Sequence, residues 1–429
     1  MAETVATKEL NFSPSAGRQQ SVSASAERIE VPPQNGSSFN LQQTIDLRLP
    51  SGMAKGHYID MHNSYVKMTL KVTRGIAGSA TADELKLARN GIYNIIQKVE
   101  ILSSSSTLSV IEDYNKLCNI FLDSESDEIF KKNIGAVQFG MSNDNVNGVT
   151  LSGGADSVVN TTFCFPLILT SLYSNTKYLP AFHNDNLVIR LTLADKAGGF
   201  VGTATSANVI LNPVSMVCQV VKLSNEAQMM VEQMNGNVYQ MVLDDWRNAK
   251  GVVATGDRSI NQNLGFSNQS LSRVIFGFYE APAITKDTQG VRVHRSVNEY
   301  TFQLNGKNYP AQKIKSGFVA GNINQSEVLA EVRASTRQSG DFMSGGSIAL
   351  ANITDGGLGR VFYEIDLEGL RANDQDSIYS GLYTVGGTTS LEVSMNADGA
   401  NQNTLNVWGQ YQGRLVLDLN QGSTFTYSV

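Results

Sequence analysis

The feature that most constrains this chain is a series of short apolar patterns that occurs twice, in the same order, roughly two hundred residues apart. The spacing is the same in both copies for three of the patterns, and the fourth, at 66–72, implies a small insertion. The matched positions are 66–72 with 274–278, Ile96/Val99/Ile101 with Val297/Tyr300/Phe302, Phe163/Phe165 with Ile365/Leu367, and Ile189/Leu191/Leu193 with Leu391/Val393/Met395. Because four matches keep one order and nearly one offset, the sequence predicts two related domains.

Each copy consists of short runs in which apolar and polar residues alternate, as at 65–72 and 414–419. A period of two places successive side chains on opposite faces of a strand, which is typical of a half-buried sheet. Clusters of Gly, Asn, Ser and Asp separate the runs and indicate turns. Helical periodicity is confined to 115–122, 123–132 and 225–234. The sequence therefore predicts an all-β protein with a few short helices.

About eight strand candidates fall in each copy, which favours an eight-stranded jelly roll, two sheets packed face to face. Long connections at 75–90 and 135–161 do not fit the even spacing of propeller blades. We expect a double jelly roll in three parts. These are an N-terminal arm (1–40), a first jelly roll (41–234) and a second jelly roll (235–429).

The predicted arm is rich in Ser, Gln, Ala and Pro and poor in large apolar residues. Such a segment cannot bury enough apolar surface to fold alone. It carries three basic and four acidic residues, so it has no surplus of cations to bind nucleic-acid phosphates. We expect the arm to extend and to dock onto a neighbouring molecule through four spaced apolar residues, Leu10, Phe12, Ile29 and Val31.

Charged residues make up 17% of the chain, below the roughly 25% that is usual, and the net charge is -6. This balance excludes a basic protein whose main task is to neutralise phosphate, and favours broad packing against other proteins. No 18-residue apolar run and no secretory pattern at the N-terminus is found, so we expect neither a transmembrane helix nor a leader. The three cysteines are far apart and are interpreted as buried thiols: Cys118, Cys164 and Cys218.

Two passages resemble a known family. An Ile-x-x-Val-x-Ile spacing within 94–101 is followed by a turn and by the segment 111–117, which contains Tyr114. Residues 165–191 carry Pro-Leu, Leu-Pro and Leu-x-Ile-x-Leu in succession. In this order the passages resemble double jelly-roll major capsid proteins of the tailless icosahedral virus lineage that includes adenovirus and membrane-containing phages. Serines at 103–106 replace a common Gly-Gly turn, which leaves the subfamily open.

The resemblance implies a structural protein of the virion shell, synthesised inside the host cell, that forms homotrimeric, pseudo-hexagonal capsomers. Its implied partners are further copies and neighbouring capsomers; penton proteins, minor capsid proteins and an internal membrane are open additions. The arm would then become ordered on the inner face of the shell. Sequence-specific binding of nucleic acid is not expected. Independently, two similar jelly rolls repeated about a threefold axis give six similar wedges, a block that tiles a shell.

Side chains that could carry chemistry are scattered. His57, His62, His183 and His294 match no zinc spacing, and no nucleotide-binding motif or nucleophile elbow occurs. Glu364, Asp366 and Glu368 alternate on one predicted strand, where solvent exposure or a bound cation is the expected role. The acidic pair at 244–245 is the second carboxylate cluster, and the aromatic residues are interpreted as packing groups: Trp246, Trp408, Tyr411, Phe425 and Tyr427.

We therefore predict a protein that is not an enzyme, with no catalytic, cofactor-binding or metal-binding residues and no cofactor. The alternative is a two-domain jelly-roll protein that binds carbohydrate or mediates adhesion. An enzyme built on a β-sandwich is a third, more remote hypothesis.

Overall fold

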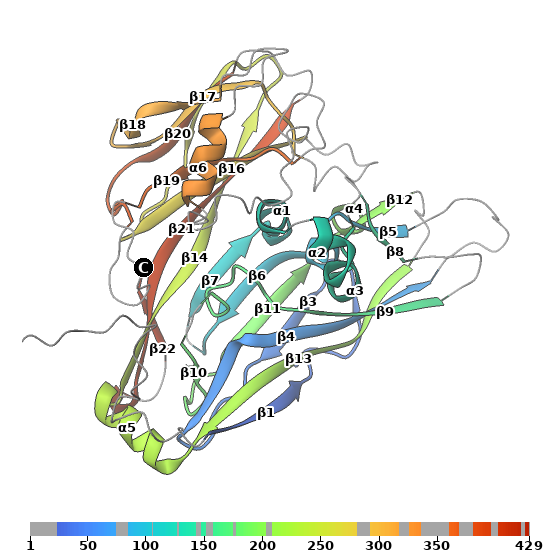
Figure 1. Cartoon of the computed structure of the whole chain (residues 1–429), viewed down its shortest axis with the longest axis vertical. Coiled ribbons are helices and arrows are strands. Elements are labelled where there is room, and N and C mark those ends of the chain that lie inside the picture. The colour runs from blue at the N-terminus through green and yellow to red at the C-terminus, as the bar shows by residue number, and fades with distance from the viewer. Residues whose placement is uncertain are drawn as a thin grey trace, which may run out of the picture.

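The chain folds into two β-sandwiches, the first in the lower part of Figure 1 and the second above it. Within each sandwich two sheets lie face to face, and a small third sheet lies beside the first sandwich. The computed structural model describes residues 24–73, 85–104, 106–126, 128–142, 147–151, 158–174, 177–202, 208–280, 292–316, 326–335, 360–368, 381–395, 402–421 and 425–428.

One sheet of the first sandwich follows the order β1-β13-β4-β10, with β2 paired to β13 and β9 paired to β4. Its strands are β1 (Ala24–Val31), β13 (Asn208–Leu223), β4 (His57–Thr73), β10 (Leu179–Pro180), β2 (Phe39–Asn40) and β9 (Val158–Phe165). The facing sheet contains β3 (Thr44–Arg48), β11 (Val188–Leu193), β6 (Ile96–Leu102) and β7 (Thr107–Glu112), in that order. The small sheet contains β12 (Phe200–Gly202), β5 (Leu85–Ala88) and β8 (Asn147–Thr150).

The second sandwich has one sheet in the order β14-β21-β16-β19, with β22 paired to β21. Its strands are β14 (Val238–Val253), β21 (Asn403–Asp418), β16 (Leu271–Glu280), β19 (Tyr363–Asp366) and β22 (Phe425–Ser428). The facing sheet contains β15 (Ser259–Asn263), β20 (Thr389–Met395), β17 (Val297–Leu304) and β18 (Lys307–Lys315), in that order.

The two sandwiches share one topology, because β1-β13-β4-β9 corresponds to β14-β21-β16-β19 and β3-β11-β6-β7 corresponds to β15-β20-β17-β18. The strand register corresponds as well. Val99 pairs with Leu191 in the first sandwich, and Tyr300 pairs with Val393 in the second. Each sandwich has a bulge at the same place, which skips Gln97 or Asn298. The predicted repeat and the predicted all-β double jelly roll are confirmed.

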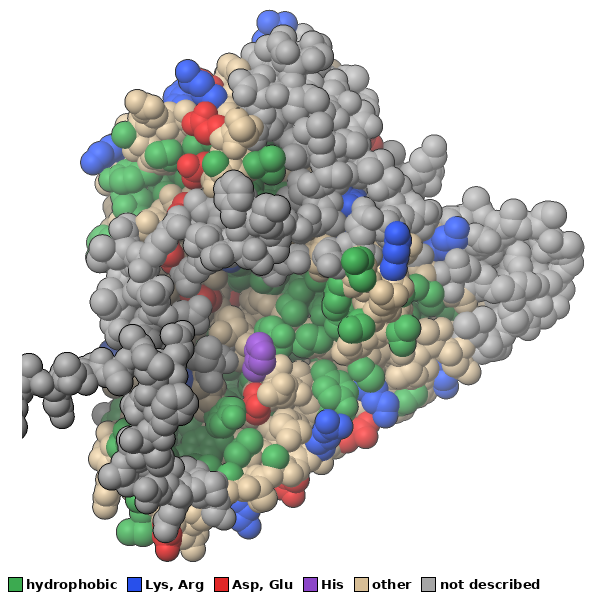
Figure 2. Space-filling model, viewed as in Figure 1, with side chains coloured by type: hydrophobic (Ala, Val, Ile, Leu, Met, Phe, Trp, Pro, Cys, Tyr) green, Lys and Arg blue, Asp and Glu red, His purple; other side chains and the backbone are tan. Residues whose placement is uncertain are grey.

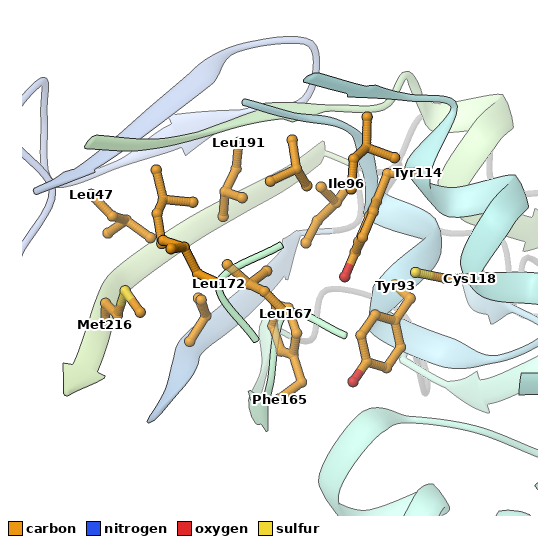
Figure 3. Close-up of a cluster of buried hydrophobic side chains, with 14 of the residues drawn as sticks. Leu47, Tyr93, Ile96, Tyr114, Cys118, Phe165, Leu167, Leu172, Leu191 and Met216 are labelled. Carbon is orange, nitrogen blue, oxygen red and sulfur yellow. The ribbon is translucent and has the colours of Figure 1, made fainter. Parts of the chain in front are cut away.

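Apolar side chains of the first sandwich fill the space between its sheets. In Figure 3, Leu47 of β3 and Leu191 of β11 lie across from Met216 of β13 and Phe165 of β9. These four side chains are at most 2% exposed. In the second sandwich, the rings of Phe276, Tyr300 and Tyr363 meet with centroids 5.0 to 5.4 Å apart. The period-two alternation of the sequence thus places its apolar residues in two cores.

The helices lie in the connections between strands: α1 (Tyr114–Glu125), α2 (Glu128–Lys132), α3 (Ile134–Phe139), α4 (Lys196–Gly199), α5 (Asn225–Asn235), α6 (Ser326–Ser335), and the 3-10 turns η1 (Gly91–Ile95) and η3 (Leu419–Gln421). Helix α5, predicted at 225–234, joins the two sandwiches. Ser224 caps its N-terminus by accepting a hydrogen bond from the Ala227 amide, and Gly236 ends it in a left-handed conformation with φ 59°. Helix α6 was not predicted.

The N-terminal strand differs from the predicted arm. Residues 24–31, placed in the arm, form β1, which pairs with β13 along its whole length from Ala24–Leu223 to Val31–Met216. Ile29 and Val31 are partly buried against the core of their own chain instead of reaching a neighbour. The physical reason is that their alternate spacing suits a strand whose backbone groups find partners on β13. Residues 1–23, with Leu10 and Phe12, lie outside the described residues.

We predict that Ile101→Asp and Phe302→Asp each unfold the sandwich that contains them. Ile101 is 2% exposed and Phe302 0% exposed, and an unpaired carboxylate at such a position costs several kcal/mol. Soluble yield and thermal melting are the measurements. Gln97→Asp, at an exposed position of β6, is the control and should melt like the original chain. Normal melting of both core variants would contradict the assignment of these strands.

Candidate functional site

The two sandwiches meet where β7 and α1 of the first lie against the sheet of the second that contains β14 and β21 (Figure 1). The chain turns from β7 into α1 at Asp113, which has a left-handed backbone with φ 49°. Apolar contact is continuous across this boundary, because Trp246 and Trp408 of the second sandwich belong to the core cluster of the first. Strand β7 and the turn that follows it in the first jelly roll therefore pack against the face of the β14–β21 sheet in the second.

A buried carboxylate at this boundary binds side chains from both sandwiches. Asp123, in α1, accepts hydrogen bonds through Oδ2 from Arg89 Nη2 at 2.7 Å and from Arg292 Nη2 at 2.6 Å. Its Oδ1 atom accepts from Lys131 Nζ at 3.4 Å and from Asn90 Nδ2 at 3.1 Å. Arg292 follows β16 in the second sandwich, whereas the other three partners belong to the first. All five side chains are at most 2% exposed.

The guanidinium of Arg292 is also held by its own sandwich. Its Nε donates to the carbonyl oxygen of Val361 at 2.8 Å, and its Nη2 donates to that of Arg360 at 2.7 Å. The guanidinium lies 5.7 Å from the ring centroid of Phe362. A planar guanidinium can make these contacts together, which a lysine ammonium could not. Arg292 therefore links the segment at 360–361 of the second sandwich to Asp123.

The electrostatics of this cluster favour an ionised Asp123. Burial raises the pKa of that carboxyl, but Arg89, Arg292 and Lys131 together outweigh burial and hold the pKa below its usual range. Burial lowers the pKa of Lys131 to about 8 and that of Arg89 to about 10, while Asp123 opposes both shifts. The single carboxylate thus offsets several buried cations. Its contribution to stability is present above the carboxyl pKa of the unfolded chain and is lost only as pH falls through the lower folded value.

A second buried carboxylate, Asp245 on β14, lies farther along the same boundary. Its Oδ1 accepts hydrogen bonds from Ser109 Oγ of β7 at 2.7 Å and from the Trp246 amide at 2.8 Å. Its Oδ2 accepts from the hydroxyls of Tyr411 at 2.9 Å and Tyr427 at 3.4 Å. Burial raises the pKa of Asp245 to about 6, although these hydrogen bonds favour the ionised form.

The turn between β7 and α1 adds polar contacts to the second sandwich. Trp408 Nε1 donates to the carbonyl oxygen of Glu112 at 3.3 Å, and Asn406 Nδ2 donates to Asp113 Oδ2 at 3.3 Å. Lys250 Nζ lies 3.0 Å from the same Asp113 oxygen. These three side chains come from β14 and β21, so one turn is held by two adjacent strands. The arrangement fixes the orientation of the two jelly rolls.

The structure corrects the interpretation of Glu364. This residue was expected to be solvent-exposed or to bind a cation, but it is 0% exposed and pairs with Arg273 Nη1 at 3.2 Å. The guanidinium of Arg273 also lies 5.0 Å from the ring centroid of Phe121 and 5.3 Å from that of Trp246. Glu364 alternates with Tyr363 and Ile365, which lie in the core of the second sandwich, so its carboxylate is on the other face of the sheet, next to Arg273 of the neighbouring strand β16.

Of the other side chains weighed in the sequence, Asp245 meets Tyr411 and Tyr427, and His183 meets Phe425. The two tryptophans are at most 2% exposed, as the packing interpretation predicts. Cys118 and Cys218 are buried thiols, whereas Cys164 is half-buried. Burial lowers the pKa of His183, which lies against the ring of Phe425, to about 4. Within the described residues, no group of three or more His, Cys, Asp or Glu side chains could hold a metal ion, and no helix could cross a membrane.

Sequence reasoning missed the Asp123 cluster. Arg89 lies 34 residues before Asp123, and Arg292 lies 169 residues after it. Local periodicity carries no information about pairing over such separations. The remaining signal is an acidic residue directly at the end of an apolar stretch, since Asp123 follows Phe121 and Leu122. A buried charge is costly unless it is paired, so this position could have been identified as one that needs a partner.

Two jelly rolls of one topology, joined through buried contacts, define this chain as a double jelly-roll protein. No family model matches the sequence, and no curated protein matches it. Several solved structures do match. PBCV-1 VP54, fitted into a reconstruction of the virophage Sputnik, is 13% identical over 97% of this chain and 99% of that chain, with a TM-score of 0.63.

Two further structures agree with this result. The Faustovirus major capsid protein is 8% identical over 94% of this chain and 92% of its own, with a TM-score of 0.63. The mavirus major capsid protein is 11% identical over 99% and 95%, with a TM-score of 0.53. The shared fold therefore extends over nearly the whole chain, although few residues are identical.

We predict that Asp123→Asn destabilises the chain by about 3–5 kcal/mol, because it leaves buried cations without their carboxylate. Denaturant unfolding followed by far-UV circular dichroism is the measurement. Asp46→Asn, which breaks the partly exposed pair with Arg190, is the control and should cost at most about 1 kcal/mol. Equal effects of the two substitutions would show that the cluster does not stabilise the boundary.

We also predict that Asp245→Asn changes the pH dependence of stability. The folded pKa of Asp245, about 6, lies above that of an unfolded aspartate, so its contribution is fully present below about pH 4 and is lost as pH rises through 6. Because burial lowers the pKa of His183, this residue makes stability depend on pH in the opposite direction over an overlapping range. The measured quantity is therefore the difference in stability between the original chain and Asp245→Asn at each pH. Relative to Asp245→Asn, the original chain should lose on the order of 3 kcal/mol between pH 4 and pH 7. A constant difference across this range would contradict the burial of an ionisable Asp245.

Proposed function

We propose that this chain is a structural major capsid protein that forms homotrimeric, pseudo-hexagonal capsomers and tiles an icosahedral shell. The observation that carries the proposal is the fixed union of two jelly rolls with the same topology and register. Three such chains around one axis present six similar wedges, which gives a nearly hexagonal block from threefold symmetry alone. The similarity in fold to the major capsid proteins of Faustovirus and mavirus supports this reading.

The equivalence of the two sandwiches also suggests where copies meet. Strand β7 lies at the edge of its sheet and packs on the second sandwich, and β18 occupies the equivalent edge of the second sandwich. We infer that β18 packs on the first sandwich of the next copy. This contact between chains would be equivalent to the contact of β7 with the second sandwich within a chain. A head-to-tail contact of this kind closes into a ring of three copies when each contact rotates the next copy by one third of a turn.

The wider assignments belong to the same proposal. The chain would be made in the host cell and located in the virion shell. Its partners would be its own copies and neighbouring capsomers, with penton proteins, minor capsid proteins or an internal membrane as further contacts. The two jelly-roll domains expected at 41–234 and 235–429 would be joined by α5, and the first would also include β1 and β2.

We predict that the purified chain has three times its 46.4 kDa mass in light scattering at micromolar concentration. Ala311→Glu, at an exposed position of β18, should shift the trimer toward monomer because it places a charge in the inferred contact. Asn263→Glu, at an exposed position of β15 on the opposite edge of the same sheet, is the matched control.

Two further measurements on the same protein separate the competing functions. A trimer that assembles into closed shells, seen by electron microscopy, supports the capsid proposal. A stable monomer or dimer that binds glycans on an array would instead favour a two-domain carbohydrate-binding or adhesion protein.

A further inference from the structure

Helix α5 lies at the lower end of the molecule in Figure 1, and it presents apolar side chains to solvent. Met230 is 66% exposed and Met234 is 85% exposed. Because they are four residues apart, they share one face of the helix, which Ala227 and Val231 extend in the spacing i, i+3, i+4, i+7. Met229 is also 60% exposed but lies on another side of the helix. We call the four residues Ala227, Met230, Val231 and Met234 the α5 stripe.

The α5 stripe borders a pocket of about 400 Å³ at the junction of the two sandwiches. This volume is in the range of ligand-binding pockets. Most of the lining is apolar or aromatic and comes from both sandwiches and from α5; it includes Tyr58, Tyr178, Leu223, Val231, Tyr239 and Met241. Figure 2 shows hydrophobic side chains in a hollow near this lower end. Val231 belongs to both the stripe and the pocket, so the two form one continuous apolar surface.

The chain itself supplies a segment at the edge of this surface. Ala24, the first residue of β1, pairs with Leu223, which lines the pocket. Residues 1–23 therefore enter the described structure directly beside the pocket. Leu10 and Phe12 lie about a dozen residues before Ala24, a length that spans roughly 40 Å when extended and about 20 Å as a flexible coil. Both lengths allow the two side chains to reach the pocket.

We propose that residues 1–23 dock onto the pocket and the α5 stripe of their own chain, with Leu10 and Phe12 as the apolar anchors. Because Leu10 and Phe12 are two residues apart, their side chains would point to the same side of an extended segment. The exposed methionines provide an adaptable surface for them, since methionine is flexible and polarisable. Covalent attachment beside the pocket gives the segment a local concentration in the millimolar range, which favours docking within one chain over exchange between chains.

The test measures methionine oxidation in the folded protein. Full-length chain, a chain that begins at residue 24, and the full-length double variant Leu10→Asp/Phe12→Asp are treated with dilute hydrogen peroxide, and sulfoxide formation is followed at each methionine by mass spectrometry. All three proteins retain β1, so the sheet is unchanged. Met230 and Met234 should oxidise about fivefold more slowly in the full-length chain than in the other two proteins. This is the slowing expected when the segment is docked for four-fifths of the time.

Met229 is the internal control, because it is the immediate neighbour of Met230 and equally accessible, and it should oxidise at the same rate in all three proteins. Equal rates at Met230 and Met234 in the three proteins would overturn the proposal, as would equal protection of Met229. Protection that weakens on dilution would show that a second copy supplies the segment, which contradicts docking within one chain. None of these outcomes depends on shell assembly, so the proposal can fail while the capsid function stands, and the reverse.

Discussion

The arrangement of the whole molecule depends on one carboxylate placed between two arginines that belong to different jelly rolls. Removing Asp123, Arg89 and Arg292 from water is expensive, and their mutual attraction repays that expense only when the geometry is satisfied. Arg292 is fixed by backbone carbonyls of its own sandwich, so it can reach Asp123 in a narrow range of orientations. Apolar contact at the boundary supplies non-directional attraction, and the ion cluster selects one relative orientation.

The two jelly rolls use equivalent parts of their fold for different purposes. In the first, the turn after β7 is held by Lys250, Asn406 and Trp408, which come from the sheet face of the second. In the second, β18 occupies the same position in its sheet but packs beside α6. Among the described residues, the two equivalent edges therefore have different neighbours: the edge of the first jelly roll contacts the other jelly roll, and the edge of the second contacts α6.

The fold was predictable from the sequence where the controlling interactions are local. Strand alternation depends on the pleat, the repeated spacing at Ile96 and Val297 depends on the pleat and a local bulge, and α5 has its cap residues on either side. Helix α6 was missed although Val328 and Val332 have helical spacing and are at most 5% exposed. The Asp123 cluster and the burial of Glu364 were not predictable, because they depend on residues brought together from distant parts of the chain.

Strand β1 has a consequence for how molecules approach one another. Among the described strands it ends the sheet order β1-β13-β4-β10, so one side of its backbone carries amide and carbonyl groups that could accept another strand. Glu27, Arg28 and Glu30 lie along this strand and are exposed or partly exposed. Charges on an edge strand oppose the addition of a further strand, since pairing would bring them against another backbone and strip away their water. The charges on β1 thereby oppose edge-to-edge pairing of molecules into fibres at high local concentration.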